Sequence, residues 1–435
     1  MRFIIGLGAA LAGLGYAIWR LFLRVDGIPA DHPSTAITPD GALEFAARVT
    51  AQPSVNRPDV ALTFAPATVS SLQLMVEGRN FYPAILADIE AATESVHINQ
   101  YGFKPGKIAD WFVPVLEARA QAGVEVRLSV DGIGSAVNGI SKPMFARLAA
   151  AGVQIVVHDA APPDRTGLYP DRPVDRRNDE IGRVDHRKMY LIDGRVAWIG
   201  GAGIEDHFEN GKFHDLFVRV EGNVVRQMQA LFLASWRYLG GPAPEADLAR
   251  FFPAPVDPGT TPLTFLLNWP RLQLHVTAAA AELIGNASQT LDIINPYVGD
   301  PTFIDSIVAA AERGVAVRMV IPDMVHGNST AWASLAYHYG RLLGAGVEVW
   351  EYPALVHAKA IVADDAVLVG TLNLDAWALY RNPEIALHIT DAAVAATFRT
   401  DLFDTDIAAS IAAVVPTDRM TLLKGRILNK FPSLL

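Results

Sequence analysis

The chain has 435 residues, enough for two or three domains with sizeable cores. Hydrophobic residues make up 51% of it, and the formal net charge of −10 argues against broad electrostatic attraction to nucleic acid. The absence of cysteine excludes disulfides, thiolate catalysis and cysteine-based zinc sites.

The chain begins with an apolar segment. A 17-residue apolar run extends from Phe3 to Trp19, and Leu21 to Leu23 lengthen it to the span of a bilayer. We predict a transmembrane anchor over residues 1–24, because a terminal position and flanking arginines favour the membrane. A cleaved signal peptide or a buried core helix would also explain the run, although no clear small-x-small cleavage site follows it.

Two regions of similar size repeat each other after this segment. In both, a helical stretch that stops at a glycine (Gly123 or Gly314) precedes a strand, and all matching segments keep their order, which indicates a duplicated unit. Alternating helices and strands predict an α/β fold with a parallel or mixed sheet covered on both faces. Composition divides the rest of the chain into a linker (25–66), a first half (67–240), a proline-rich linker (241–262), a second half (263–413) and a basic tail (414–435).

The repeat is interrupted by one insertion. The separation from Gly152 to His186 is 34 residues but that from Gly346 to His357 is 11, so the first half has 34 − 11 = 23 additional residues before its histidine. Arginines alternate with acidic residues in this insertion, which is typical of a solvated surface. A loop that gates a neighbouring site is the alternative.

Each half contains one copy of the pattern H-x-K-x-x-x-x-D. The chain has only eight lysines and 11 histidines, so composition alone predicts about 0.01 such patterns. On a strand, His and Lys two residues apart point to the same face, and this is costly in apolar surroundings unless an anion lies between them. The two copies therefore indicate binding of a negative group. Their residues are His186, Lys188 and Asp193 in the first half, and His357, Lys359 and Asp364 in the second.

The paired motifs, with GTLNLD closing the second, resemble the phospholipase D superfamily. Longer stretches such as VRLSVDGIGS, LLGAGVEVWEYPALVHAKAIVADDAVLVGTLNLD and LNKFPSLL are similar to its cardiolipin synthase branch, over roughly residues 70–435. The resemblance implies two tandem α/β/α sandwich halves with pseudo-twofold symmetry, preceded by the N-terminal transmembrane helix. Because both motifs lie in one chain, a monomer would be active.

The resemblance also implies a mechanism on a phosphodiester. Lys188 and Lys359 would neutralise the phosphoryl oxygens where charge develops. His186 would attack phosphorus to form a phosphohistidine and His357 would protonate the leaving alkoxide, with the reversed roles as the alternative. Asn373 would donate to the phosphoryl oxygens. No metal or other cofactor is expected.

Two carboxylates recur after the motifs. Asp215 lies 29 residues after the first motif histidine, and Glu384 lies 27 residues after the second. An imidazole that presents one nitrogen to phosphate needs an acceptor for its other N–H, and we predict that these carboxylates supply it. Ordinary carboxylates at a strand edge are the alternative. Asp193 and Asp364 sit at turns, where we expect structural and electrostatic support.

A few positions depart from the family pattern. Gly203 stands where asparagine is usual, Trp377 and Ala378 replace an Arg-Ser pair, and His214 replaces an arginine. The turn of the second motif, ADDAV, is one residue shorter than expected. These changes leave both motifs whole, and they bear on the acceptor and on the lipid.

The basic tail has an amphipathic pattern. Met420, Leu423, Ile427 and Phe431 recur at helical spacing, with arginines and lysines elsewhere around the turn. Such a helix binds an anionic membrane surface or docks on the body of the protein.

Together these features predict a phosphatidyltransferase of cardiolipin synthase type, held in the bacterial inner membrane by a single N-terminal anchor. Its substrate would be an anionic phospholipid similar to phosphatidylglycerol, and no nucleic acid partner is expected. A phospholipid hydrolase of the same superfamily is the first alternative. The acidic charge argues against a nuclease, and two complete motifs argue against a non-catalytic lipid-binding scaffold.

Overall fold

The computed structural model describes residues 34–51, 61–158, 184–243, 247–270 and 272–430. The predicted anchor over residues 1–24 and most of the insertion before His186 lie outside these ranges. Within them, no helix combines the length and the apolar character needed to cross a membrane.

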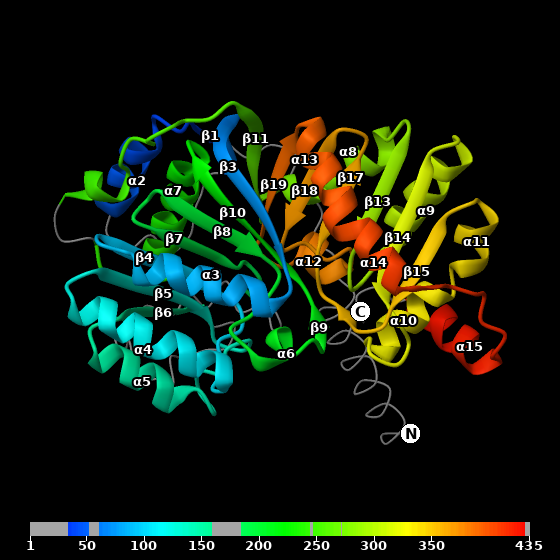
Figure 1. Ribbon diagram of the computed structural model, residues 1–435, viewed down its shortest axis with the longest axis horizontal. Helices are drawn as coiled ribbons and strands as arrows, with labels where there is room; N and C mark the ends of the chain where they lie inside the picture. The colour runs from blue at the N-terminus through cyan, green and yellow to red at the C-terminus, as the bar shows by residue number, and fades with distance from the viewer. Residues whose placement is uncertain (1–33, 52–60, 159–183, 244–246, 271, 431–435) are drawn as a thin grey trace, which may run out of the picture.

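Sixteen of the described strands form one mixed sheet that runs through both halves (Figure 1). From its outer edge inward, the first half contributes β6 (Gln154–His158), β5 (Glu125–Asp131), β4 (Ser95–Gln100), β7 (Met189–Ile192), β8 (Val196–Gly200), β10 (Leu216–Gly222) and β3 (Ala67–Val76). The second half repeats this order with β15 (Glu348–Tyr352), β14 (Ala316–Pro322), β13 (Thr290–Ile294), β17 (Ala360–Ala363), β18 (Ala366–Gly370), β19 (Glu384–Thr390) and β11 (Thr261–Trp269). Two short strands complete it: β20 (Ile411–Ala412) beside β15, and β12 (Gln273–Leu274) beside β11.

The two halves join where β3 meets β11. These strands pair antiparallel, with Leu263 opposite Ala67 and Thr261 opposite Val69. In each half, β4–β6 or β13–β15 are parallel and the strands nearer the joint are antiparallel. The predicted pair of α/β halves is therefore confirmed, and their sheets are fused edge to edge.

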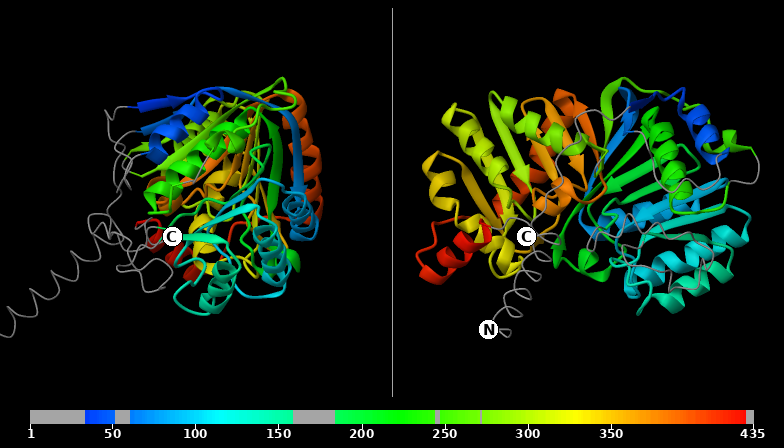
Figure 2. Two further views of the ribbon diagram at one scale, coloured as in Figure 1. Left: turned by 90° about the vertical axis from the view of Figure 1, so that its left-hand side faces the viewer. Right: turned by 180° about the vertical axis from the view of Figure 1, so that it is seen from behind.

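Helices cover both faces of the sheet. In Figure 1, α3 (Gly78–Glu90) lies in front of the first half and α13 (Ala392–Phe398) in front of the second. Helices α7 (Val224–Tyr238) and α8 (His275–Asn286) lie on the opposite face of the sheet, which the right-hand view of Figure 2 shows. The exchange of faces follows from the pseudo-twofold relation between the halves. The remaining helices of the two halves are α4 (Lys107–Gln121), α5 (Lys142–Ala150), α6 (Asp206–Glu209), α9 (Pro301–Glu312), α10 (Ser329–Ala336), α11 (Tyr339–Gly344), α12 (Ala376–Tyr380), a π-helical turn (Arg399–Asp404) and α14 (Thr405–Ala409).

Local sequence explains where the helices begin and end. Helix α4 buries Ile108, Phe112 and Leu116 at a spacing of four residues, so one face packs on the sheet. It stops before Gly123, whose φ of 89° is left-handed, and Gly314 has a φ of 92° after α9. Both glycines thus turn the chain into the next parallel strand.

The segment predicted as the first linker is part of the fold. It carries β1 (Ser34–Ile37), α2 (Ala42–Ala51) and β2 (Ala61–Phe64), and β1 pairs in parallel with β2. Phe45 of α2 and Phe64 of β2 join the buried core that also contains α7. In the second linker, a 3₁₀ turn (Leu248–Phe251) places Phe251 in the same core.

The C-terminal helix α15 (Arg419–Leu428) packs on α10. Its Gly425 lies so close to α10 that an added Cβ would clash with the carbonyl oxygen of Ala333, and Asn429 donates to the carbonyl oxygen of Ser334 at 3.0 Å. The helix therefore docks on the body. Its outer face exposes Met420, Leu423 and Ile427.

Candidate active site

The two motifs meet at the joint between the halves. His186 and Lys188 directly precede β7, and His357 and Lys359 directly precede β17. A short parallel bridge between β9 (Phe213–His214) and β16 (Leu355–Val356) ties the second motif to the first half. The backbone N–H of His357 donates to the carbonyl oxygen of His214 at 2.6 Å. The bridge therefore delivers the second motif beside Asp215.

Each motif histidine pairs with a carboxylate of the other half. Nδ1 of His186 lies 2.9 and 3.1 Å from the two carboxylate oxygens of Glu384, and Nδ1 of His357 lies 2.6 Å from Oδ2 of Asp215. Both carboxylates are fully buried. The sequence singled out these acceptors, but its spacing suggested a partner within each half. The crossed pairing places both motifs in one site.

The lysines are buried beside their histidines. Lys188 donates to the carbonyl oxygen of His186 at 2.6 Å, and its Nζ lies 4.9 Å from the ring centroid of Tyr101. Nζ of Lys359 lies 2.8 Å from Nδ1 of His357 and also donates to its carbonyl oxygen. Burial lowers the pKa of Lys188 to about 8 and that of Lys359 to about 7. An anion bound between the lysines would favour their charged forms.

The histidines themselves favour the neutral form. Burial, followed by the lysine charges, lowers the pKa of both His186 and His357 well below its usual value. Burial raises the pKa of Asp215 to about 7 and that of Glu384 well above its usual range. Each histidine–carboxylate pair therefore shares protons as a unit near neutral pH.

The surroundings of the two Nδ1 atoms differ. Around His186, the Nδ1 contacts are carboxylate oxygens, so Nδ1 carries the hydrogen and Nε2 carries the lone pair. Around His357, Nδ1 lies 2.6 Å from Oδ2 of Asp215 and 2.8 Å from Nζ of Lys359, so its contacts include a carboxylate as well as an ammonium. In both rings Nδ1–H can therefore pair with a carboxylate, which leaves Nε2 of each ring to face a substrate.

The motif aspartates lie away from these groups. Asp193 and Asp364 close the far ends of β7 and β17, about 16 Å along the strand from the lysines. Each has a left-handed φ, of 52° at Asp193 and 49° at Asp364. The carboxylate of Asp193 accepts hydrogen bonds from the three backbone N–H groups and one hydroxyl of residues 93–95. That of Asp364 accepts the same set from residues 288–290. These bonds fix the start of β4 or β13. The geometry thus assigns both aspartates to support of the strands.

Asn373 lies at the site next to an acidic cap. It is buried, its Oδ1 has no hydrogen-bond partner, and its side chain bonds to Asp375. Asp375 accepts from the N–H groups of Trp377 and Ala378 at 2.8 and 3.0 Å. The two residues that replace the family's polar pair therefore use their backbone to hold the cap, and Ala378 is buried.

Two further residues lie beside the buried carboxylates: Thr371, which sequence reasoning did not single out, and His214, which it noted only as a departure from the family. Thr371 donates its hydroxyl to Glu384. His214 lies between Glu77, 2.6 Å from Nδ1, and Asp406, 2.8 Å from Nε2, and these bonds outweigh burial and raise its pKa to about 9. A charged His214 thus takes the place of the usual arginine. That departure was visible in the sequence, but its partners come from distant segments.

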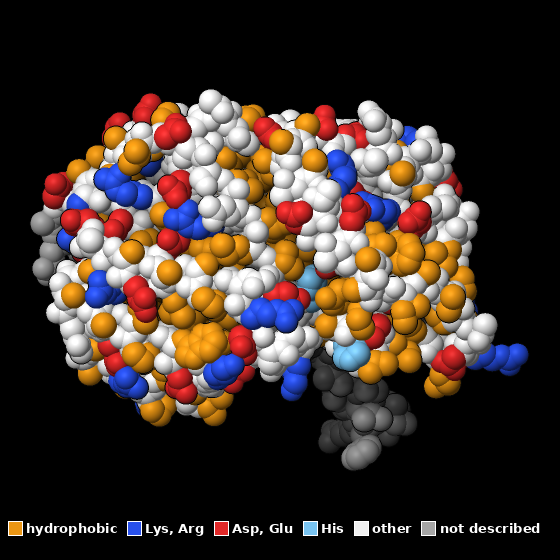
Figure 3. Space-filling view, in the orientation of Figure 1, with side chains coloured by type: hydrophobic (Ala, Val, Ile, Leu, Met, Phe, Trp, Pro, Cys, Tyr) orange, Lys and Arg blue, Asp and Glu red, His pale blue; other side chains and the backbone are white. Residues whose placement is uncertain are grey.

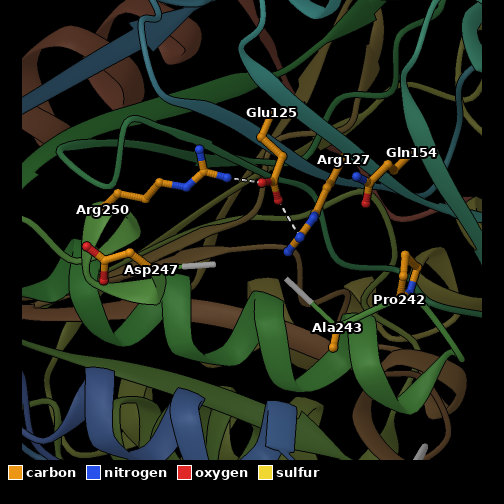
Figure 4. Close-up of a pocket in the computed structure, with 7 residues that line it drawn as sticks. All are labelled: Glu125, Arg127, Gln154, Pro242, Ala243, Asp247 and Arg250. Carbon is orange, nitrogen blue, oxygen red and sulfur yellow. Dashed lines mark hydrogen bonds and ion pairs between the residues drawn. The ribbon is translucent and has the colours of Figure 1, made fainter. Parts of the chain in front are cut away.

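A separate pocket lies at the other end of β5 (Figure 4). Glu125 begins this strand and Asp131 ends it at the catalytic edge, a separation of about 20 Å. Arg127 and Arg250 both pair with Glu125, and Trp236 lies 5.3 Å from the Arg127 guanidinium. The pocket, of about 360 Å³, is therefore separate from the motifs.

Among the described residues, no cluster of three or more potential metal ligands occurs.

The space-filling view shows a histidine surface, in pale blue, between the two halves (Figure 3). The side chains of the two motifs are largely enclosed: His186 is 8% exposed, Lys188 1% and Lys359 3%. A substrate phosphate would therefore leave bulk water when it enters the site.

Comparisons with known proteins agree with this geometry. The chain matches the family described as "Cardiolipin synthase, PLD-like domain" over residues 85–236 and 281–406. Cardiolipin synthase A of Klebsiella pneumoniae is 32% identical over 342 residues, which cover 74% of this chain and 66% of that protein. The major cardiolipin synthase of Bacillus subtilis is 27% identical over 348 residues, which cover 77% and 69%. The chain thus spans about two thirds of the length of these relatives.

Solved structures share the architecture at lower identity. A phosphatidylserine synthase of Haemophilus influenzae superposes with a TM-score of 0.65 at 11% identity, covering 90% of this chain and 98% of that chain. A polyphosphate kinase from Porphyromonas gingivalis gives a TM-score of 0.52 at 16% identity, covering 84% and 54%. These two likenesses show a common fold of two related halves.

Proposed function

The chain belongs to the cardiolipin synthase family of phospholipase D-like proteins, as its motifs predict, and on this premise we propose that it transfers a phosphatidyl group from one phospholipid to an alcohol. It is an enzyme of the phospholipase D superfamily. The proposed donor is an anionic lipid such as phosphatidylglycerol, and the proposed acceptor is the glycerol headgroup of a second such lipid.

In the first step, Nε2 of His186 attacks phosphorus. The P–N bond forms while the bond from phosphorus to the headgroup oxygen breaks. His357, which the bound phosphate favours in its doubly protonated form with Nδ1–H held by Asp215, passes its Nε2 proton to that oxygen, so free glycerol leaves and a neutral imidazole remains. Lys188 and Lys359 neutralise the charge on the phosphoryl oxygens, and Asn373 donates to them. The division of roles follows the family pattern, and the carboxylate at each Nδ1 leaves Nε2 of both rings free for phosphorus or for the leaving oxygen.

In the second step, the acceptor alcohol resolves the phosphohistidine. Its hydroxyl proton passes to Nε2 of His357, its oxygen bonds to phosphorus, and the P–N bond to His186 breaks. Both histidines return to their starting states. Asp215 and Glu384 hold the two rings throughout through their Nδ1 contacts. Because both crossed pairs lie within one chain, a monomer would be sufficient.

The proposal places the protein at a bacterial inner membrane, held by the anchor over residues 1–24. Exposed apolar side chains support an additional contact with the membrane surface. In α15, Met420 is 71% and Ile427 is 50% exposed, and Lys424 and Arg426 are exposed beside them. Apolar and basic residues on one short helix favour an anionic lipid surface.

The single observation that carries the proposal is the crossed pairing, which gives one site two imidazoles and two buried ammonium groups. The test is to incubate the purified full chain in detergent with phosphatidylglycerol and to separate the lipid products. Cardiolipin with free glycerol is the expected result. Phosphatidic acid as the sole product, with alcohol acceptors in excess, would identify a phospholipid hydrolase instead.

A further inference from the structure

Two glycines follow β8 beside the catalytic pair of the second motif. A Cβ added at Gly201 would lie 2.5 Å from Oδ1 of Asp215, and one added at Gly203 would lie 2.5 Å from Oε2 of Glu205. A carboxylate therefore occupies the space that a side chain at each position would need. The two positions are at most about 7 Å apart along the chain. Glu205 is thus close enough to the site for its charge to raise the pKa of Lys188 against the larger effect of burial.

Glu205 is held in place but remains open to a ligand. Its Oε1 lies 2.8 Å from Nζ of Lys104, and its Oε2 lies 3.9 Å from Nε2 of His207. The side chains of Lys104, His207 and Glu205 are 39%, 32% and 13% exposed. Unlike the catalytic lysines, Glu205 and Lys104 combine charge with access from outside, whereas burial lowers the pKa of His207 and favours its neutral ring.

The Glu205 cluster shares a wall with the catalytic histidine. The ring of His207 lies 4.4 Å from that of Phe208 and 4.1 Å from that of Phe213. The ring of His357 lies 5.2 and 5.9 Å from the same two phenyl rings. The cluster therefore borders the side of the site where His357 exchanges a proton with an alcohol.

The second half has a different arrangement at the matching positions. There Asn373 stands in place of Gly203, and Asp375, in place of Glu205, caps α12. Glu205 precedes α6 but makes no capping bond. Its carboxylate instead fills the space where an asparagine side chain would begin, so asparagine at 203 and the present position of Glu205 are mutually exclusive.

A carboxylate in this place selects a particular ligand. It accepts hydrogen bonds and repels phosphoryl oxygens, so its natural partner is a hydroxyl group. We propose that Glu205, supported by Lys104 and His207, forms a polyol subsite that accepts a hydrogen bond from a second hydroxyl of the acceptor alcohol, while the reacting hydroxyl faces His357. This deepens the proposed function and rests on it. The polyol is either a lipid headgroup or free glycerol.

The test is an acceptor competition with phosphatidylglycerol as donor in detergent. Equal concentrations of isotope-labelled glycerol and 1-propanol compete, and the labelled phosphatidylglycerol, phosphatidylpropanol and cardiolipin formed are measured. Wild type is expected to favour glycerol. Glu205→Gln should lower the ratio of glycerol product to propanol product by about tenfold or more, the size of one hydrogen bond to a charged acceptor. A parallel fall in cardiolipin identifies a lipid headgroup as the polyol, and a fall confined to labelled product identifies free glycerol.

Control variants separate this effect from structural damage. Glu209→Gln removes a surface carboxylate of α6 that pairs with Lys107, and its product ratio should match wild type. Gly203→Asn should lose more activity than Gly203→Asn/Glu205→Gly, because only the double variant has room for the amide. Lys104→Met should lower the ratio in the same direction if Glu205→Gln fails to fold.

The outcomes distinguish the two proposals. No transfer product from wild type with any alcohol would overturn the proposed function. Transfer by wild type, with an unchanged product ratio in both Glu205→Gln and Lys104→Met, would overturn the polyol subsite and leave the transferase in place.

Discussion

Replacing His357 by alanine should convert the enzyme into one that stops after the first step. The change removes the acid that protonates the leaving alkoxide, which costs on the order of 10²–10⁴-fold in rate, or about 3–5 kcal/mol of barrier. Asp215 and Lys359 remain as opposite charges beside the vacated space, so no uncompensated charge is left in the site. A phosphodiester with a nitrophenol leaving group needs no proton, and its first step should therefore be spared.

The assay is a rapid-mixing measurement of nitrophenol release by the His357→Ala enzyme. One equivalent of nitrophenol per chain should appear in a burst. Slow turnover should follow, because His357 is also the base for the second step. Mass spectrometry should place phosphorus on His186. His186→Ala should give no burst, and His326→Ala, which changes an exposed histidine, should match wild type. A burst from His186→Ala with phosphorus on His357 would refute the assignment of roles.

Three further results are expected. Burial lowers the pKa of Lys359 to about 7, so inhibition by sulfate should be strong at pH 6 and weaken as pH rises through 7 to 8, where the ammonium is lost; Lys359→Arg should shift the loss of inhibition upward to about pH 8, where Lys188 loses its charge, and an unchanged profile would contradict it. Glu384→Gln and Asp215→Asn should each lower kcat by about 10²-fold or more, because each carboxylate orients one ring, and circular dichroism should show that both variants keep the fold. A loss of kcat in only one of the two variants would argue against the crossed pairs. Asp364→Asn should lower stability by about 1–2 kcal/mol, or Tm by about 2 °C for a chain of this length. Burial raises the carboxyl pKa of Asp364, but the hydrogen bonds from the N–H groups at residues 288–290 and from the Ser288 hydroxyl together outweigh it and lower the pKa to about 2. This stability is therefore present above pH 4 and disappears as pH falls towards 2, and a constant difference between pH 2 and 7 would contradict it.

The sequence was sufficient to predict the duplicated α/β halves, because periodic segments recur in the same order. It also pointed to Asp215 and Glu384 through their matching positions. It could not predict the crossing, since His186 and Glu384 are 198 residues apart and spacing alone favours a partner in the same half. The pairing depends on the joint between β3 and β11, which is a tertiary feature.

The same limit applies to the proposed polyol subsite and to the partners of His214. Gly203 was recognised as a departure from the family, but only coordinates show that Glu205 fills the space beside it. His214 was recognised as a substitution, yet Glu77 and Asp406 come from segments 137 and 192 residues away. A single sequence marks unusual positions, and the distances between segments decide what they do.

The crossed pairs make catalysis depend on the joint between the halves. Two buried ammonium groups and two buried carboxylates are costly to hold in a low-dielectric site unless they face one another. Neither half supplies a matched set, because each histidine finds its carboxylate across the joint. The apolar core that holds the joint contains residues of both halves, among them Val69 and Leu263. Packing far from phosphorus therefore fixes the charges that act on it, and a half expressed alone should be inactive even where it folds.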